Sequence, residues 1–150
     1  MTHTLHQRTI GIIPPAAIRS GAYAPILEQL QQSGLTLTLV LRRTLTKTEV
    51  VSICRDRPQG SALQPFLEFM TDGPSLLLIL EGSNAIQRAQ DLTGCRLDSP
   101  APAESIRGQF TMSEQPLHYV LYVSTSPAAA LHEYQVLFQN TDLSHLKASA

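Results

Sequence analysis

The apolar run at residues 76–80 (LLLIL) constrains the fold of this chain more than any other feature. A membrane-spanning helix needs about 20 consecutive apolar residues, and this longest run is far shorter. It lies between the breaker signal at 72–74 (DGP) and Glu81-Gly82, so it has the length and the boundaries of a buried strand. The sequence therefore predicts a buried strand at 75–80 and no transmembrane segment.

Strand and helix patterns alternate along the rest of the chain. β-rich or alternating runs predict four strands, at 8–13, 35–41, 75–80 and 117–123. Helical periodicity predicts helices from Tyr23 to a cap at Gly34, over 62–70 and over 84–92, with an irregular segment at 93–107. This interleaved order favours an α+β domain of the ferredoxin-like class, with helices packed on a four-stranded antiparallel sheet.

Local signals predict where the first strand ends and where two further helices begin. Pro14-Pro15 ends the first strand, because proline removes a ladder donor. Thr46 and Glu49 have the spacing of a capping box that opens a short helix. Ser126-Pro127 predicts the start of the last helix. The core side of that helix is predicted to hold Ala130, Leu131, Tyr134 and Leu137.

Composition predicts one cytoplasmic domain spanning 1–150, with a core at about 8–138 and a tail at 139–150. A formal net charge of −1, from 11 basic and 12 acidic residues, argues against a nucleic-acid partner. Cys54 and Cys95 match neither a disulfide framework nor a zinc-ligand spacing. We expect no metal, no cofactor and no membrane contact. The pairs Arg42-Arg43 and Arg55/Arg57 are interpreted as solvated.

Four blocks, in order, resemble the nucleoside diphosphate kinase family over residues 8 to about 138. They are RTIGIIPP at 8–15, the segment 46–74 that closes with FMTDGP, EGSNA at 81–85 and SIRGQF at 105–110. The resemblance implies the ferredoxin-like sheet already predicted. It also implies a site in which a histidine carries the γ-phosphate between nucleotides.

At that site the sequence departs from the family pattern. Tyr122 stands where the resemblance places the phosphate-accepting histidine, and a neutral tyrosine is a poor nucleophile at neutral pH. Other ligand positions differ too, at Pro14, Cys54, Ala62, Gln90 and Arg96. The matching residues are Arg107, Ser124 and Glu133.

These departures predict a catalytically inactive family member that acts as a structural or interaction subunit with protein partners. The resemblance makes a ciliary or flagellar axonemal assembly the favoured setting, and it is compatible with a homo-oligomer. The alternative is a divergent nucleotide binder or phosphotransferase that uses His118 with Arg107 and Arg88 in a rearranged site. A nucleotide sensor without chemistry is a third interpretation. The remaining histidines are interpreted as surface residues.

Overall fold

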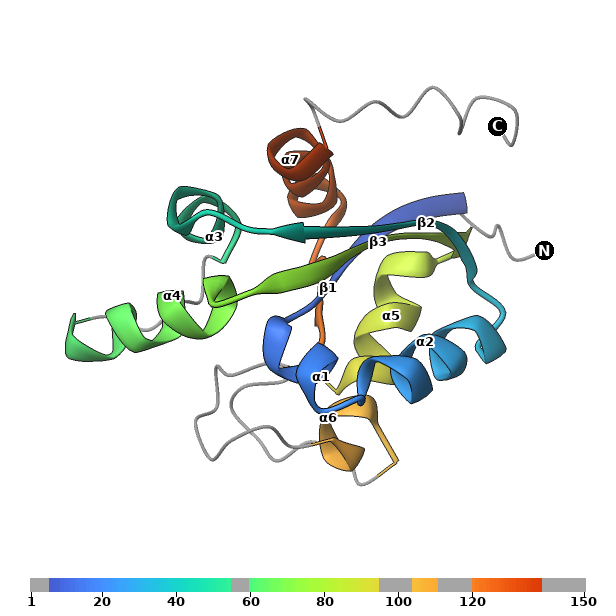
Figure 1. The fold of residues 1–150 in the computed structure, drawn as a ribbon. Helices are drawn as coiled ribbons and strands as arrows, with labels where there is room; N and C mark the ends of the chain where they lie inside the picture. Colours follow the sequence, from blue (N-terminus) through green and yellow to red (C-terminus); the bar gives the residue numbers. More distant parts are fainter. Residues whose placement is uncertain (1–5, 55–59, 95–103, 111–119, 139–150) are drawn as a thin grey trace.

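A computed structural model describes residues 6–54, 60–94, 104–110 and 120–138 (Figure 1). Within these ranges the chain forms one four-stranded sheet, with strand order β2-β3-β1-β4. All three strand pairings are antiparallel. The predicted α+β class with a four-stranded antiparallel sheet is confirmed. The single-domain span of 1–150 stays a prediction.

The strands are β1 (His6–Ile13), β2 (Thr36–Thr44), β3 (Pro74–Ser83) and β4 (Tyr122–Val123). The apolar run at 76–80 lies inside β3, the strand between β2 and β1. β3 pairs with β1 along the whole of β1, from His6 opposite Ser83 to Ile13 opposite Leu76. Helices cover both faces of the sheet along β3, which explains why this strand is continuously buried over most of its length.

The helices are α1 (Pro15–Arg19), α2 (Tyr23–Gln32), α3 (Lys47–Ile53), α4 (Leu63–Thr71), α5 (Ala85–Thr93), α6 (Ile106–Gln109) and α7 (Pro127–Phe138). The helix α1 is new relative to the sequence prediction. Pro14-Pro15 does end β1, but Pro14 is also the N-cap and Pro15 the first residue of α1. Proline is tolerated there because the N–H of the first helical residue makes no hydrogen bond within the helix. The short helix α6 lies partly inside the segment predicted to be irregular.

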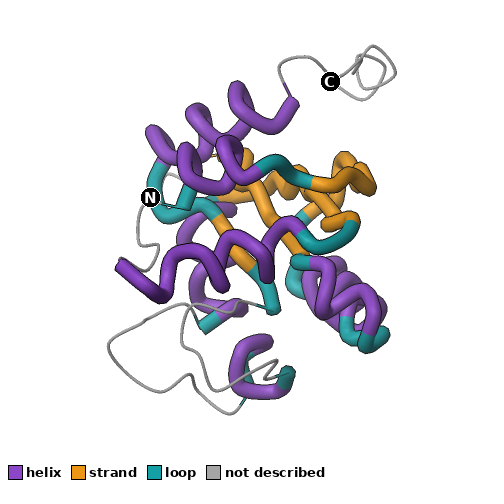
Figure 2. The backbone as a smooth tube through the Cα atoms, turned by 60° about the vertical axis from the view of Figure 1, so that its left-hand side comes forward, coloured by secondary structure: helices purple, strands orange, loops and turns teal. Residues whose placement is uncertain are grey.

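Two apolar clusters pack on opposite faces of the sheet. On β3, Leu77 and Ile79 belong to a cluster with α3, α4 and α7, whereas Leu78 and Leu80 belong to a cluster with α2, α5 and α6. This alternation follows from the two-residue period of a strand. Figure 1 shows α3 and α7 on one side of the strands and α2, α5 and α6 on the other. Figure 2 shows the same arrangement of sheet and helices after a rotation.

Two predictions about the C-terminal part differ from the structure. Among the described residues, β4 contains only Tyr122–Val123, and residues 117–119 of the predicted strand lie outside the described residues. Leu131 was predicted on the core side of α7, but it is 61% exposed. Ala130 and Leu137 are buried as predicted. Within the described part of the chain, no helix is both long and apolar enough to cross a membrane.

Candidate functional site

Tyr122 joins three elements of the structure. It lies on β4, pairs with Ile12 of β1 and is half-buried. Its hydroxyl donates a hydrogen bond to Glu133 Oε2 on α7. The same hydroxyl lies 3.4 Å from the main-chain oxygen of Ile53, the last residue of α3. The residue that the resemblance places at the phosphate-accepting position therefore lies on β4 and contacts both α7 and α3.

The carboxylate of Glu133 is buried beside Tyr122 and Ser124. Glu133 is 1% exposed and Ser124 is fully buried. Ser124 Oγ donates to Glu133 Oε1 at 2.6 Å and accepts the main-chain N–H of Ile10 at 2.9 Å. A hydroxyl thus meets each oxygen of the carboxyl group, as a buried polar group requires. The structure brings together three predicted site residues, Tyr122, Ser124 and Glu133.

His132 links α7 to α3 next to this cluster. Its Nε2 lies 3.0 Å from Ser52 Oγ and 3.1 Å from the main-chain oxygen of Ser52. The interpretation of His132 as an ordinary surface residue is therefore wrong, because its ring is half-buried and bonded. Together with the hydrogen bond network of Tyr122, this contact fixes α7 against the end of α3.

Gln90 and Arg107 approach the sheet from its other face. Gln90, on α5, donates its side-chain amide to the main-chain oxygen of Ser124 at 3.2 Å. Arg107 is half-buried on α6, a helix opened by Ser105, whose Oγ accepts the N–H of Gly108 at 3.1 Å. α6 packs through the buried Ile106 on the α2 and α5 face, whereas Glu133 lies on α7. Arg107 and Glu133 thus stand on helices that cover opposite faces.

Arg88, a candidate phosphate cation in the sequence, is bound to main-chain oxygens. Its guanidinium donates to the carbonyl of Ser83 at 3.2 Å and to the carbonyl of Ser33. These bonds tie α5 to the end of β3 and to the residue that caps α2. The structure gives Arg88 a bracing role between elements.

The remaining predicted positions either terminate helices or lie outside the described residues. Pro14 is the N-cap of α1, Cys54 is the buried C-cap of α3, and Ala62 is the exposed N-cap of α4. Arg96 and His118 lie outside the described residues. Among the residues that the structure describes, no group of three His, Cys, Asp or Glu side chains could hold a metal ion.

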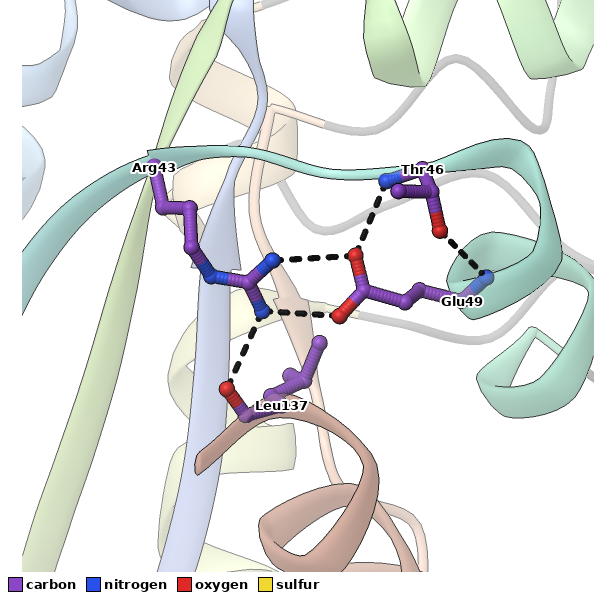
Figure 3. A network of polar contacts seen from close by, with 4 residues as sticks. All are labelled: Arg43, Thr46, Glu49 and Leu137. Atoms are coloured by element: carbon purple, nitrogen blue, oxygen red, sulfur yellow. Dashed lines mark hydrogen bonds and ion pairs between the residues drawn. The ribbon is translucent and has the colours of Figure 1, made fainter. Parts of the chain in front are cut away.

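A second polar network holds α3 and α7 to β2 (Figure 3). Arg43 on β2 makes two hydrogen bonds to the carboxylate of Glu49, at 3.0 and 2.8 Å. It also donates to the carbonyl of Leu137, near the end of α7, at 3.0 Å. Thr46 and Glu49 complete the predicted capping box, with bonds of 2.9 and 3.1 Å. The interpretation of Arg43 as a solvated residue is wrong.

This network changes the titration of Glu49. Burial by itself raises the pKa of the carboxyl group, because it disfavours the charged form. The hydrogen bonds and charge of Arg43, with the N–H of Thr46, outweigh burial and leave the pKa below its ordinary value. The ionised form of Glu49 is therefore the form that the folded chain stabilises.

The comparison with known proteins identifies the class of this fold and site. The family model described as nucleoside diphosphate kinase matches residues 7–143. A nucleoside diphosphate kinase of Staphylothermus marinus is 31% identical over 140 residues, which cover 91% of this chain and 96% of the relative. One from Francisella philomiragia has the same identity and coverage. The chain belongs to the nucleoside diphosphate kinase family.

Solved structures agree with this assignment. The nucleoside diphosphate kinase of Aquifex aeolicus is 26% identical, with a TM-score of 0.77 over 91% of this chain and 97% of that one. The Borrelia burgdorferi enzyme, solved with bound vanadate and ADP, superposes with a TM-score of 0.78 at 19% identity, over 92% of this chain and 90% of that one. The second likeness concerns the fold alone.

These relatives correct one expectation. The departures at Tyr122 and the other ligand positions predicted a protein without enzymatic activity. Relatives that are 31% identical over 91% of the chain are nucleoside diphosphate kinases, which points to an enzyme. The expectation of a catalytically inactive protein is therefore wrong. It treated the loss of individual ligands as the loss of the activity.

Sequence reasoning missed two contacts beside the site, Arg43 to Leu137 and His132 to Ser52, but it predicted the neighbouring capping box. The capping box at Thr46 and Glu49 was visible, because its two residues are three positions apart. The reach of Arg43 to Leu137 and of His132 to Ser52 spans 94 and 80 positions. Local spacing carries no signal for pairs so distant, since the fold alone brings them together.

Proposed function

We propose that this chain transfers the terminal phosphoryl group of a nucleoside triphosphate to a nucleoside diphosphate, the reaction that the names of its relatives describe. The observation that carries the proposal is the 31% identity to these enzymes over 91% of the chain. Their family model also spans residues 7–143, which include every residue of the described fold except His6.

The proposed phosphoryl carrier is His118, four residues before Tyr122 in the sequence. An imidazole is largely unprotonated near pH 7, whereas a phenol with a reference pKa near 10 remains neutral. The hydroxyl of Tyr122 is moreover engaged by Glu133 and faces the end of α3. These contacts favour a structural role for Tyr122, so the chemistry is assigned to the histidine.

The proposed reaction has two balanced steps. A neutral ring nitrogen of His118 attacks the γ-phosphorus of the triphosphate, and the bond between that phosphorus and the β,γ-bridging oxygen breaks. A nucleoside diphosphate leaves with the electron pair of the broken bond. A second diphosphate then takes the phosphoryl group from the histidine by the reverse step. Arg107, the cation that matches the family pattern, is proposed to bind phosphate during both steps.

The chemical linkage of the transferred group tests the carrier. The folded protein is incubated with γ-labelled ATP, and the labelled protein is treated with acid and with alkali. A phosphohistidine is lost in acid and survives alkali, and we expect this label in the wild type and in His6→Ala. It should be absent in His118→Ala. An acid-stable label, or a label that survives in His118→Ala, would contradict the assignment to His118.

We also propose that the chain, as a single domain, assembles into a homo-oligomer. The support is β2, which forms one edge of the sheet and carries Val40 at 43% exposure. An exposed apolar residue on an unpaired edge favours pairing with another chain. Sedimentation velocity of wild type and Val40→Lys tests this, because the charge should reduce assembly. The scaffold role and the axonemal setting inferred from the resemblance stay predictions without support from these relatives.

A further inference from the structure

Among the described residues, no strand pairs with the first half of β1 on its outer edge. β4 pairs with β1 only at Gly11 and Ile12, and the N–H of Ser124 then donates to the oxygen of Ile10 at 3.1 Å. In an antiparallel ladder both main-chain groups of a residue point to the same side, and the side alternates along the strand. The N–H and C=O of Arg8 therefore point to the same side of β1 as those of Ile10, which is the side on which β4 lies further along the strand. Within the described ranges, no strand pairs with Arg8 on that side.

An apolar groove runs beside this open edge. A cavity of about 380 Å³ is formed between β1, the start of α5 and the first half of α7. Ile10, Ile86 and Ala130 are almost completely buried, so the core fixes the walls of the groove. Leu131 is 61% exposed and lines the same cavity. The lining residues are Gln7, Arg8, Ile10, Ile86, Pro127, Ala130, Leu131 and Tyr134.

The guanidinium of Arg8 lies at the same edge, and its charge is only partly neutralised by Glu81. Arg8 donates Nε to Glu81 at 2.9 Å, and its side chain is 58% exposed. Neither terminal nitrogen of its guanidinium has a hydrogen-bond acceptor in the described part of the chain. Gln7 is differently placed, because its side-chain oxygen accepts the N–H of Ile86 at 3.3 Å. The edge thus offers main-chain groups, an apolar groove and a cationic side chain within a few residues.

We propose that this edge binds an extended segment of a partner protein by strand addition. The main chain of the segment pairs with Arg8, one apolar side chain enters the groove, and an acidic side chain binds the guanidinium of Arg8. A second copy of this chain is a poorer occupant, because a two-fold pairing centred here would set Arg8 opposite Arg8. A small apolar ligand would leave the main-chain groups unused. The groove lining includes none of Tyr122, Ser124, Glu133 and Arg107.

A peptide titration tests the proposal on the full chain. The probe is a fluorescently labelled eight-residue peptide of alternating valine and threonine with one central glutamate. Its control has proline at every second position, which removes the main-chain donors. We expect the probe to bind and the proline peptide to bind at least tenfold more weakly. The variant Leu131→Lys should weaken binding at least tenfold, because a charge would enter the apolar groove.

Matched variants separate the groove from general effects. Tyr23→Lys changes another exposed apolar residue, on α2, which does not line the groove, and it should leave binding unchanged. Arg8→Gln should weaken binding several-fold and reduce its salt dependence. Absence of binding to the folded wild type, or equal binding to Leu131→Lys, would overturn the proposal. So would binding that arises only after residues 139–150 are removed, since the tail would then be the occupant. Self-association abolished by Leu131→Lys would likewise identify a second copy.

Discussion

The hydroxyl of Tyr122 on β4 donates a hydrogen bond to the buried carboxylate of Glu133 on α7. Ser124, two residues further along the chain, donates to the other oxygen of the same carboxylate at 2.6 Å. The short strand β4 is thereby attached to α7 through one carboxyl group. A buried polar group with each oxygen bonded is stable as long as its partners remain, and the loss of one partner is costly.

Tyr122→Phe removes the hydroxyl and leaves one oxygen of Glu133 without that donor. We expect the free energy of unfolding to fall by about 1–3 kcal/mol, the range for a buried polar group that loses its partner. Urea unfolding followed by circular dichroism measures the change. Tyr134→Phe is the matched control, because the hydroxyl of Tyr134 makes no hydrogen bond within the described residues. Equal effects of the two variants would contradict the role of the Tyr122 hydroxyl.

Ser124→Ala should destabilise the chain through two groups at once. It removes a donor to Glu133 and also the acceptor of the N–H of Ile10, which lies 2.9 Å from Ser124 Oγ. We expect a loss of at least about 2 kcal/mol on the same urea scale. The control is Ser61→Ala, because Ser61 is exposed and makes no side-chain hydrogen bond in the described part of the chain. A change below about 0.5 kcal/mol in Ser124→Ala would sink this explanation.

The pH dependence of stability should report Glu49. Its pKa is lower in the folded chain than the ordinary value of 4.5, because the bonds from Arg43 and Thr46 outweigh burial. The folded state therefore gains stability above the unfolded pKa and loses it as pH falls through the folded pKa. Urea unfolding between pH 3 and 7 measures this. The wild type should lose more stability on acidification than Glu49→Gln does.

The control for this pH series is Glu68→Gln. Glu68 is exposed on α4, and no ion pair or side-chain hydrogen bond involves it among the described residues. Its replacement should leave the acid part of the stability curve parallel to that of the wild type. If Glu49→Gln and wild type gave parallel curves as well, the proposed role of the Arg43 network in the pH dependence would be wrong.

Substitution of Arg88 distinguishes a structural role of this side chain from a phosphate-binding role. Since its guanidinium donates to the carbonyls of Ser83 and Ser33, Arg88→Ala should lower the free energy of unfolding by about 1–2 kcal/mol. The KM for nucleotide should stay within about twofold of the wild type, because the change removes no substrate contact. Arg42→Ala is the control, since Arg42 is exposed on β2. An increase of KM by tenfold without loss of stability would assign Arg88 to phosphate.

The sheet and most helices follow from short-range patterns in the sequence. The run inside β3, the capping box at Thr46 and the signal at Ser126-Pro127 each depend on residues a few positions apart. The last helix shows the limit of such patterns. Periodicity predicted Leu131 on its core side, whereas the residue lies beside a groove that depends on where β4 leaves β1.

The site was predictable only through the resemblance. The resemblance selected Tyr122, Ser124 and Glu133, and their side chains are hydrogen-bonded to one another in the structure. Neither spacing nor propensity indicates that the hydroxyls of Tyr122 and Ser124 would share one carboxylate. Missing ligands, taken one at a time, did not predict the kinase class of the relatives, because an altered site can use a residue at another position. That step needs relatives of known activity.

The proposed phosphoryl transfer is tested most directly by the formation of GTP from ATP and GDP by the purified chain of residues 1–150 with magnesium. Circular dichroism must first show that the wild type and His118→Ala are folded. We expect GTP to form in proportion to the amount of wild-type protein, whereas His118→Ala should form none above the buffer blank. If the folded wild type forms no GTP above that blank, the proposed phosphoryl transfer is contradicted.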